Sequence, residues 1–356
     1  MPTGANVVTR SSASHVLTFL HSLPKAELHL HLEGSIRPET AAELAARHHV
    51  AISPEELGAR YKFTDFAGFL DSFKWITSLL RDPKDYAIVT RRLLEELIRQ
   101  NVVYAEITIS AGVMLLRKQN IEANLAAICE TAQNLGYERI RVAWILDCVR
   151  QFGPEPAMRI ARIAARFQAS GIVGFGMGGD ELALAAADFR PSFDFARSQG
   201  LNLVCHAGEI GGPQSVRDAV EILGAERIGH GIAVMHDRAL AESLAARHVV
   251  LENCLTSNVA TGALARQTGS PGATIADHPL KKLLDAGSLV TLSTDDPAMF
   301  STDLLTEYSR AAALGLSARQ LVHLAEQSFR AAFLPLADKR AYVENFRSAA
   351  KSFALL

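Results

Sequence analysis

Residues 25–35 read KAELHLHLEGS, an apolar run in which His29 and His31 alternate with leucines. A period of two is typical of a β-strand, because residues two apart in a strand project from the same face. His29 and His31 would therefore lie side by side, with the leucines on the opposite face. Such a pair either binds one metal ion or is held by ordinary hydrogen bonds, and this segment alone leaves both interpretations open.

Short apolar and β-branched runs recur along the rest of the chain, and stretches with helical periodicity separate most of them. The predicted strands fall at residues 27–33, 104–110, 139–148, 171–179, 201–209, 227–232, 248–258 and 288–297. Strand alternating with helix in this way predicts an α/β protein with a parallel (β/α)8 TIM barrel. We expect residues 1–356 to form a single domain.

The segment from about residue 36 to 100 is too long for one crossover, roughly 70 residues against a usual dozen. We expect it to form extra helices that act as a lid over the barrel mouth. Phe66, Phe69, Phe73 and Trp75 are candidates for an apolar pocket wall. We nevertheless expect at least half of them to pack in the core.

Composition excludes several classes of partner. A net charge of −2 and a pI near 6.6 give no basic stripe for nucleic acid. No run of 18 apolar residues is present to span a membrane, and the opening MPTGANVVTRSSASHV lacks the apolar core of a signal peptide. We therefore expect a cytoplasmic protein with a small-molecule substrate, while its oligomeric state is not predicted.

Unusual polar residues lie at the carboxyl ends of four predicted strands, which is where catalytic groups of TIM barrels are found. They are His29 and His31 in the first strand, His206 and Glu209 in the fifth, His230 in the sixth, and Asp295 and Asp296 in the eighth. Because these strand ends meet on one face of a barrel, the sequence predicts a single site.

The ligand types favour zinc. The four cysteines are far apart and form no CxxC pair, so any metal must use histidine and carboxylate. We assign His29, His31, His206 and Asp295 as ligands, since three imidazoles and one carboxylate suit zinc. The fourth strand, GIVGFGMGG, has no lysine or acid to bridge a second ion. One ion is therefore expected, and His230 is left to orient a ligand or act as a base.

Zinc activates water at neutral pH, so the sequence predicts a hydrolase. Glu209 follows His206 by three residues and lies beside the metal without needing to bind it. Its carboxyl group can donate a proton to a ring nitrogen while water adds to the neighbouring carbon. Asp296, next to Asp295, can accept a hydrogen bond from a second ring position. This arrangement indicates hydrolytic attack on a heteroaromatic ring.

The motifs HLHLEGS, GGDE, HAGE, RIGHGI and STDDP, in this order, resemble those of the adenosine deaminase family within the amidohydrolase superfamily. The resemblance implies a zinc ion on the four ligands assigned above and loss of ammonia from C6 of a purine. It also implies that Glu209 protonates N1 and that His230 orients or deprotonates the attacking water. Asp296 would contact N7, and the backbone N–H of Gly179 would contact N3.

The substrate is less sharply indicated than the reaction. By the resemblance, His31, Glu33, Gly179 and Asp296 form the expected substrate-binding set. Nucleoside deaminases usually have aspartate, which contacts the ribose 5′-hydroxyl, where this chain has Glu33, and adenine deaminases often have glutamate. The segment DDPAMFSTDL is closer to nucleoside deaminases.

We therefore expect an adenosine-type nucleoside, with 6-aminodeoxyfutalosine as a second nucleoside candidate and free adenine as the alternative. Two less favoured alternatives are an amide or lactone hydrolase and a barrel that binds nucleosides without turnover. The roles of Asp180 and Glu181 in GGDE stay open, and both residues can simply shape the loop.

Overall fold

The computed structural model describes residues 19–136 and 138–351. Eight strands form one sheet in sequence order, and all neighbouring strands are parallel. The strands are β1 (Lys25–His31), β2 (Val102–Ile109), β3 (Arg141–Val149), β4 (Ile172–Gly178), β5 (Asn202–Ala207), β6 (Arg227–His230), β7 (Val250–Asn253) and β8 (Leu289–Leu292). The predicted eight-stranded barrel is confirmed, with each strand overlapping its predicted run.

The sheet closes where the segment after β8 meets β1. Leu30 forms a parallel bridge with Asp295, and the His31 N–H donates to the Asp295 carbonyl oxygen at 2.8 Å. In return, the Asp295 N–H donates to the carbonyl oxygen of His29 at 3.0 Å. This seam brings the side chains of His29, His31 and Asp295 close together although they are distant in sequence.

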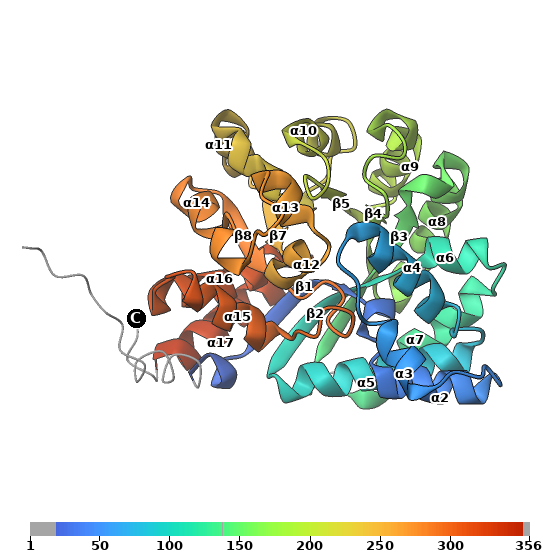
Figure 1. Ribbon diagram of the computed structural model, residues 1–356. Helices are drawn as coiled ribbons and strands as arrows, with labels where there is room; N and C mark the ends of the chain where they lie inside the picture. Colours follow the sequence, from blue (N-terminus) through green and yellow to red (C-terminus); the bar gives the residue numbers. More distant parts are fainter. Residues whose placement is uncertain (1–18, 137, 352–356) are drawn as a thin grey trace, which may run out of the picture.

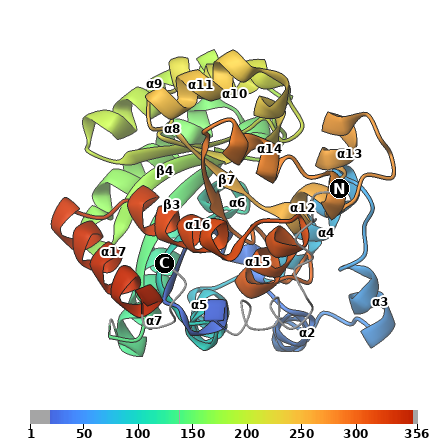
Figure 2. The ribbon, with the colours of Figure 1, turned by 90° about the vertical axis from the view of Figure 1, so that its left-hand side faces the viewer.

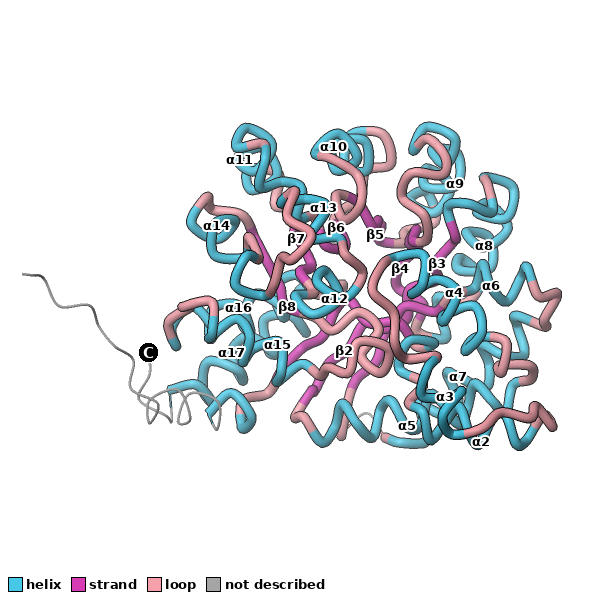
Figure 3. Tube along the Cα trace, viewed as in Figure 1, coloured by secondary structure: helices cyan, strands magenta, loops and turns pink. Residues whose placement is uncertain are grey.

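The helices form an outer ring around the strands (Figures 1 and 3). The α-helices are α2 (Pro38–Arg47), α3 (Pro54–Ala59), α4 (Phe66–Thr77), α5 (Pro83–Arg99), α6 (Ala111–Leu116), α7 (Ile121–Leu135), α8 (Pro154–Arg166), α9 (Ala186–Ser198), α10 (Pro213–Glu221), α11 (Arg238–Ala246), α12 (Leu255–Ala260), α13 (Ala263–Thr268), α14 (Leu280–Asp285), α15 (Leu304–Ala313), α16 (Ala318–Ala331) and α17 (Leu336–Lys351). Short 3-10 helices are η1 (Glu33–Ser35), η2 (Arg150–Phe152), η3 (Gln168–Ser170), η4 (Ile232–His236) and η5 (Ile275–Asp277). In Figure 2, α16 and α17 lie side by side on the outside of the barrel, and α16 packs against β8 and β1.

Helices α2 to α5 form the predicted insertion between β1 and β2. Asp82 caps the N-terminus of α5 by accepting hydrogen bonds from backbone N–H groups, and it forms a capping box with Asp85. Arg47 of α2 donates to both carboxylates at 2.8 Å. These contacts hold α2 against the start of α5, so the insertion is tied together by charge as well as by its apolar faces.

Charged side chains inside the barrel support the site from below, which sequence reasoning missed. The buried Arg227 side chain contacts Glu106 and Glu252, each with a nitrogen–oxygen distance of 2.6 Å. Its guanidinium group also lies 3.7 Å from the ring centroid of Phe333. Because the second oxygen of Glu252 contacts His29 at 2.9 Å, this network supports the orientation of a site histidine.

Within the described ranges, no helix is long and apolar enough to cross a membrane. All four cysteines are buried and unpaired, as expected from their spacing. The opening segment used in the signal-peptide argument lies outside the described residues, and the single domain over residues 1–356 stays a prediction.

Candidate active site

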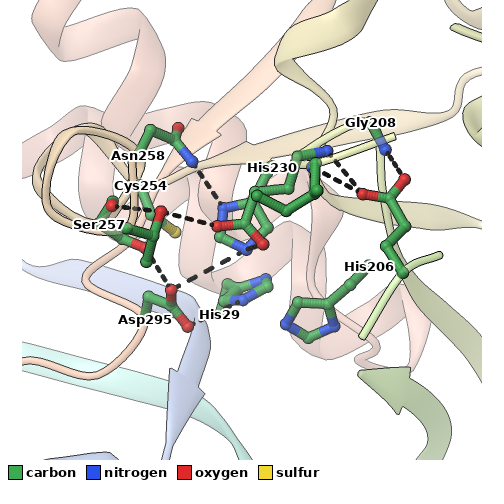
Figure 4. A network of polar contacts seen from close by, with 12 residues as sticks. His29, His206, Gly208, His230, Cys254, Ser257, Asn258 and Asp295 are labelled. Atoms are coloured by element: carbon green, nitrogen blue, oxygen red, sulfur yellow. Dashed lines mark hydrogen bonds and ion pairs between the residues drawn. The ribbon is translucent and has the colours of Figure 1, made fainter. Parts of the chain in front are cut away.

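Side chains from four predicted strand ends converge at one point of the barrel mouth. The ligand atoms of His29, His206, His230 and Asp295 all lie within 4.8 Å of one another. Figure 4 shows the three imidazole rings and the aspartate facing this common point. The cluster forms a metal-binding site made of histidine nitrogen and carboxylate oxygen.

His31 lies at the edge of the same cluster. Its Nε2 atom is 3.3 Å from His206 Nε2 and 3.4 Å from Asp295 Oδ1. His29 Nε2 is also 3.4 Å from that Asp295 oxygen. Five side chains therefore surround the point, one more than the four ligands of a tetrahedral zinc site.

The hydrogen bonds of two histidines prepare them to bind a metal. His29 Nδ1 lies 2.9 Å from a carboxylate oxygen of Glu252, and His206 Nδ1 lies 3.2 Å from the Met177 carbonyl oxygen. Both partners accept, so each Nδ1 carries the proton and each Nε2 presents a lone pair. His29 Nε2 is buried and makes no hydrogen bond within the described part of the chain. The donor set therefore fits a divalent ion.

Two of the cluster residues have an unusual backbone conformation. His230 has φ of +63° and Asp295 has φ of +65°, both in the left-handed region that non-glycine residues rarely occupy. The Asn253 side chain donates to the His230 carbonyl oxygen at 2.5 Å and helps to hold this conformation. Such conformations cost about 1–3 kcal/mol each and concentrate at active sites.

Glu209 follows β5 and borders the metal cluster. One of its carboxyl oxygens lies 3.5 Å from His230 Nε2, and the other accepts a hydrogen bond from the Thr261 hydroxyl at 3.1 Å. Burial raises the pKa of Glu209 to about 8, because the charged form is poorly solvated there. The raised pKa favours the protonated carboxyl group, the form that a general acid needs.

Glu181 anchors the loop that carries Glu209. Its Oε2 atom accepts from the backbone N–H groups of Glu209, Ile210 and Gly211 at 3.1, 2.8 and 2.8 Å. Its Oε1 atom accepts from the Gly208 N–H at 2.5 Å. The sequence left the role of Glu181 open, and the structure shows that this carboxylate fixes the loop geometry.

Asp296 lies beside the cluster and is also buried. Burial and the neighbouring charge of Asp295 raise the pKa of Asp296 well above its usual range. A Cβ atom on Gly34 would lie only 1.7 Å from Asp296 Oδ1. The glycine of HLEGS is therefore required for Asp296 to occupy its place in the cavity wall.

A cavity of about 580 Å³ opens above these residues. Its floor includes His31, His206, Glu209, Asp295 and Asp296. His230 lines it as well, and a volume of this size lies within the range of small-molecule sites.

Helices α4 and α6 supply the outer wall of the cavity. Phe66, Phe69 and Phe73 of α4 line it, while they also pack against the core. Trp75 does not line it and instead lies under the Arg60 guanidinium group, 5.0 Å from the ring centroid. Three of the four candidates therefore line the cavity, and all four also pack against the core.

The GGDE turn also lines the cavity. Gly179 has φ of +90°, and a Cβ atom there would lie 2.3 Å from the Gln151 side-chain oxygen. That oxygen accepts from the Asp180 N–H at 2.8 Å, and the Asp180 side chain accepts from the Leu182 N–H at 3.0 Å. Asp180 thus contributes to the turn geometry that holds Gly179 in the wall.

Glu33 lies behind the cavity wall and is not among the residues that line it. It is buried, and both carboxyl oxygens lie 3.1–3.2 Å from the N–H of Ser110, which does line the cavity. Direct contact between Glu33 and the substrate stays a prediction. In the structure, the Glu33 carboxyl group supports the cavity wall by accepting from the backbone N–H of Ser110.

Asp147 is a cavity residue that sequence reasoning missed. It lies near the end of β3, where its Oδ2 atom would be 2.8 Å from a Cβ atom on Gly178. Burial raises the pKa of Asp147 well above its usual range, which favours the neutral acid. The available signal was an acidic residue within an otherwise apolar strand, RVAWILDCV.

A histidine and aspartate metal cluster at the carboxyl ends of a (β/α)8 barrel, with a buried carboxyl group of raised pKa beside it, is typical of a metal-dependent hydrolase. Residues 24–349 match the family model described as adenosine deaminase. The chain belongs to the adenosine deaminase family, whose members hydrolyse C–N bonds of cyclic amidines in small purine-type molecules.

Two relatives and one solved structure illustrate the range of the family. The chain is 41% identical over 328 residues to an aminodeoxyfutalosine deaminase of Streptomyces coelicolor, covering 90% of this chain and 83% of that protein. It is 36% identical to an adenine deaminase of Rhizobium leguminosarum bv. trifolii, covering 90% and 97%. The crystal structure of an adenine deaminase from Arthrobacter aurescens superposes with a TM-score of 0.85 at 28% identity, covering 93% and 100%.

Proposed function

We propose that this protein hydrolytically deaminates a 6-aminopurine nucleoside at C6, with one zinc ion per chain held by His29, His31, His206 and Asp295. The observation that carries the proposal is that one cavity is lined by three of the site histidines and Asp295 together with the buried carboxyl groups of Glu209 and Asp296. Hydrolysis of a lactone or an amide would offer these two carboxyl groups no ring nitrogen to which they could donate.

Zinc, when bound, supplies the Lewis acidity that activates water near neutral pH. Glu209 donates its proton to N1 of the purine as water adds to C6. The C6–N bond then breaks and ammonia leaves, so that a 6-oxopurine remains. Asp296, whose raised pKa favours the neutral acid, donates a hydrogen bond to N7, which has only a lone pair in a purine substituted at N9, and His230 orients the attacking water.

A nucleoside is favoured over the free base because the cavity extends well beyond one purine ring. Above the floor, the phenylalanines of α4 and the helix α6 add an apolar wall, and Arg117 lies at its edge. We infer that this wall receives a substituent on the sugar side. 6-Aminodeoxyfutalosine, an adenine nucleoside that carries a benzoate group, matches an apolar wall bordered by a cation.

Free adenine is the second candidate. The support for it is the 36% identity with adenine deaminases over most of the chain, together with Glu33 in place of aspartate. In this alternative the mechanism on the ring is unchanged, and the outer part of the cavity is filled by water.

The test is ammonia release by zinc-loaded protein from adenosine, 2′-deoxyadenosine, adenine and 6-aminodeoxyfutalosine, compared by kcat/KM. We expect a nucleoside to exceed adenine by at least about tenfold, a difference of about 1.4 kcal/mol in transition-state binding. Higher kcat/KM for adenine would overturn the choice of substrate and keep the mechanism. Failure of all four, with zinc bound, would overturn the reaction.

A further inference from the structure

His230 differs from the other cluster histidines in the partner of its Nδ1 atom. Nδ1 of His29 and of His206 faces an acceptor, whereas His230 Nδ1 lies 3.0 Å from the side-chain amide nitrogen of Asn258 (Figure 4). We propose that Asn258 and His278 are positioning residues that keep the proton of His230 on Nε2, facing the cavity. This inference rests on the proposed function and specifies how one of its residues acts.

The direction of this hydrogen-bond chain is set at its outer end by a backbone group. The N–H of Leu280, the first residue of α14, donates to His278 Nδ1 at 3.1 Å. A backbone N–H can only donate, so His278 Nδ1 presents a lone pair and the ring proton is on Nε2. Burial lowers the pKa of His278 to about 3, which agrees with a neutral ring.

The ring proton of His278 fixes the donor and acceptor at each of the two inner hydrogen bonds. His278 Nε2 lies 3.1 Å from the side-chain oxygen of Asn258, which accepts its proton. Asn258 therefore presents its amide nitrogen to His230 Nδ1, which must accept. Asn258 and His230 are at most 1% exposed and His278 is 5% exposed, so water does not compete for these contacts.

His230 consequently presents an N–H group, not a lone pair, to the cavity. Its Nε2 atom lies 3.5 Å from a Glu209 oxygen and 3.9 Å from an Asp295 oxygen. In this tautomer His230 donates a hydrogen bond to the oxygen of the attacking water and orients its lone pair towards the purine. The same tautomer removes His230 Nε2 from the available metal ligands, which leaves His29, His31, His206 and Asp295.

Asn258→Asp tests the chain directly. An aspartate can only accept, so it would hold the His230 proton on Nδ1 and expose a lone pair on Nε2. The tautomer is measured by long-range proton–nitrogen NMR on protein labelled with ¹⁵N-histidine, in zinc-loaded and metal-depleted samples, with His230→Gln to assign the signal. We expect Nε2–H in the unmodified protein, Nδ1–H in the variant, and a fall in kcat of about 10²-fold with little change in KM.

His278 provides a second pair of variants if Asn258→Asp does not fold. The amide of His278→Gln can still donate to Asn258, whereas His278→Leu cannot. We expect the glutamine variant to keep Nε2–H and nearly full kcat, and the leucine variant to show mixed tautomers and a roughly tenfold lower kcat. His248→Gln, at an exposed histidine, is the matched control and should change neither measurement.

An unmodified protein with the His230 proton on Nδ1 would overturn the inference. So would an unchanged His230 tautomer in both Asn258→Asp and His278→Leu. Because the NMR measurement needs no substrate, it is independent of the proposed reaction. Absence of ammonia release combined with the expected tautomers would overturn the proposed function and support the hydrogen-bond chain.

Discussion

The strand-end cluster and the outer cavity wall are built in different ways. The cluster residues lie in the last part of a strand or, for Asp295, just after one, and they are buried or nearly so. Hydrogen bonds hold them in place: Glu252 accepts from His29, and the Ser257 hydroxyl donates to Asp295. The wall is formed by α4 and α6, whose cavity side includes the exposed residues Lys74, Leu116 and Arg117. Rigid strand ends suit the chemistry that all substrates share, and adjustable helix side chains suit the choice among substrates.

This contrast predicts two kinds of mutational effect. Changes in the cluster should reduce turnover of every substrate by a similar factor. Changes in the wall should reduce turnover of some substrates only.

Removal of the metal should abolish ammonia release from every substrate. Dialysis against a chelator leaves the buried His29 Nε2 without a hydrogen bond among the described residues, so thermal stability should also fall. Activity and Tm are measured before and after dialysis, and again after one equivalent of zinc is restored. Full activity in metal-depleted protein would contradict the assignment of the cluster.

Glu209→Gln should lower kcat by about 10²–10⁴-fold for adenosine and for larger nucleosides alike. Glutamine has the same shape and keeps a hydrogen bond from Thr261, but it cannot deliver a proton to N1. Zinc content and KM should change little. Glu130→Gln on the exposed face of α7 is the control, and activity of Glu209→Gln near that of this control would exclude the proton-donor role.

Glu181→Gln should lower kcat/KM by about 10–10²-fold for all substrates. A glutamine has one acceptor oxygen, and its amide nitrogen would face backbone N–H donors that now bind Oε1 and Oε2. Unsatisfied buried groups cost about 1–3 kcal/mol, so the loop and Glu209 should shift. Steady-state kinetics with several substrates measures the effect, and loss confined to one substrate would contradict it.

The barrel and most of the metal cluster could be predicted from the sequence. The barrel was predictable because apolar runs with strand length alternate with helical periodicity, and the cluster was predictable because polar residues interrupt those runs at their carboxyl ends. His29, His206 and Asp295 follow from that reasoning alone. A period of two decides which side chains share a face of a strand, and parallel strands bring their ends to one edge.

Contacts between loops were not predictable in the same way. His278 and Asn258 lie in irregular or short helical segments, where no period indicates which side chains meet. The contact between the Glu33 carboxyl group and the Ser110 N–H was not predictable either, while contact of Glu33 with the substrate stays a prediction. Arg227, Glu106 and Glu252 each place a charge within a strand, but only the closed barrel shows that the charges pair.

Arg117→Gln should affect substrates unequally. The Arg117 side chain donates to the Lys74 carbonyl oxygen at 2.8 Å and to the Thr77 hydroxyl at 3.2 Å, which places its charge at the cavity edge. We expect kcat/KM for benzoate-bearing 6-aminodeoxyfutalosine to fall by about tenfold, while adenosine changes less than about twofold. Lys118→Gln, at the neighbouring exposed cation, is the control. An equal loss for both substrates would show that Arg117 acts on wall structure and not on substrate charge.

Asp82→Ala should have the smallest effect and change stability without changing substrate preference. Loss of this N-cap at α5 should lower the free energy of unfolding by about 1 kcal/mol, measured by urea denaturation. Although burial raises the pKa of Asp82, the hydrogen bond from Arg47 holds it below the ordinary 3.8. The stabilisation by the Asp82 charge is therefore complete above pH 3.8 and is lost as the pH falls through the lower pKa of the folded state. In acid, the free energies of unfolding of Asp82→Ala and the unmodified protein should converge. Asp82→Asn keeps the cap without the charge, so its free energy of unfolding should lie between those of the unmodified protein and Asp82→Ala. A change in the ratio of kcat/KM for nucleoside to kcat/KM for adenine in either variant would mean that the ion pairs of the insertion also control substrate selection.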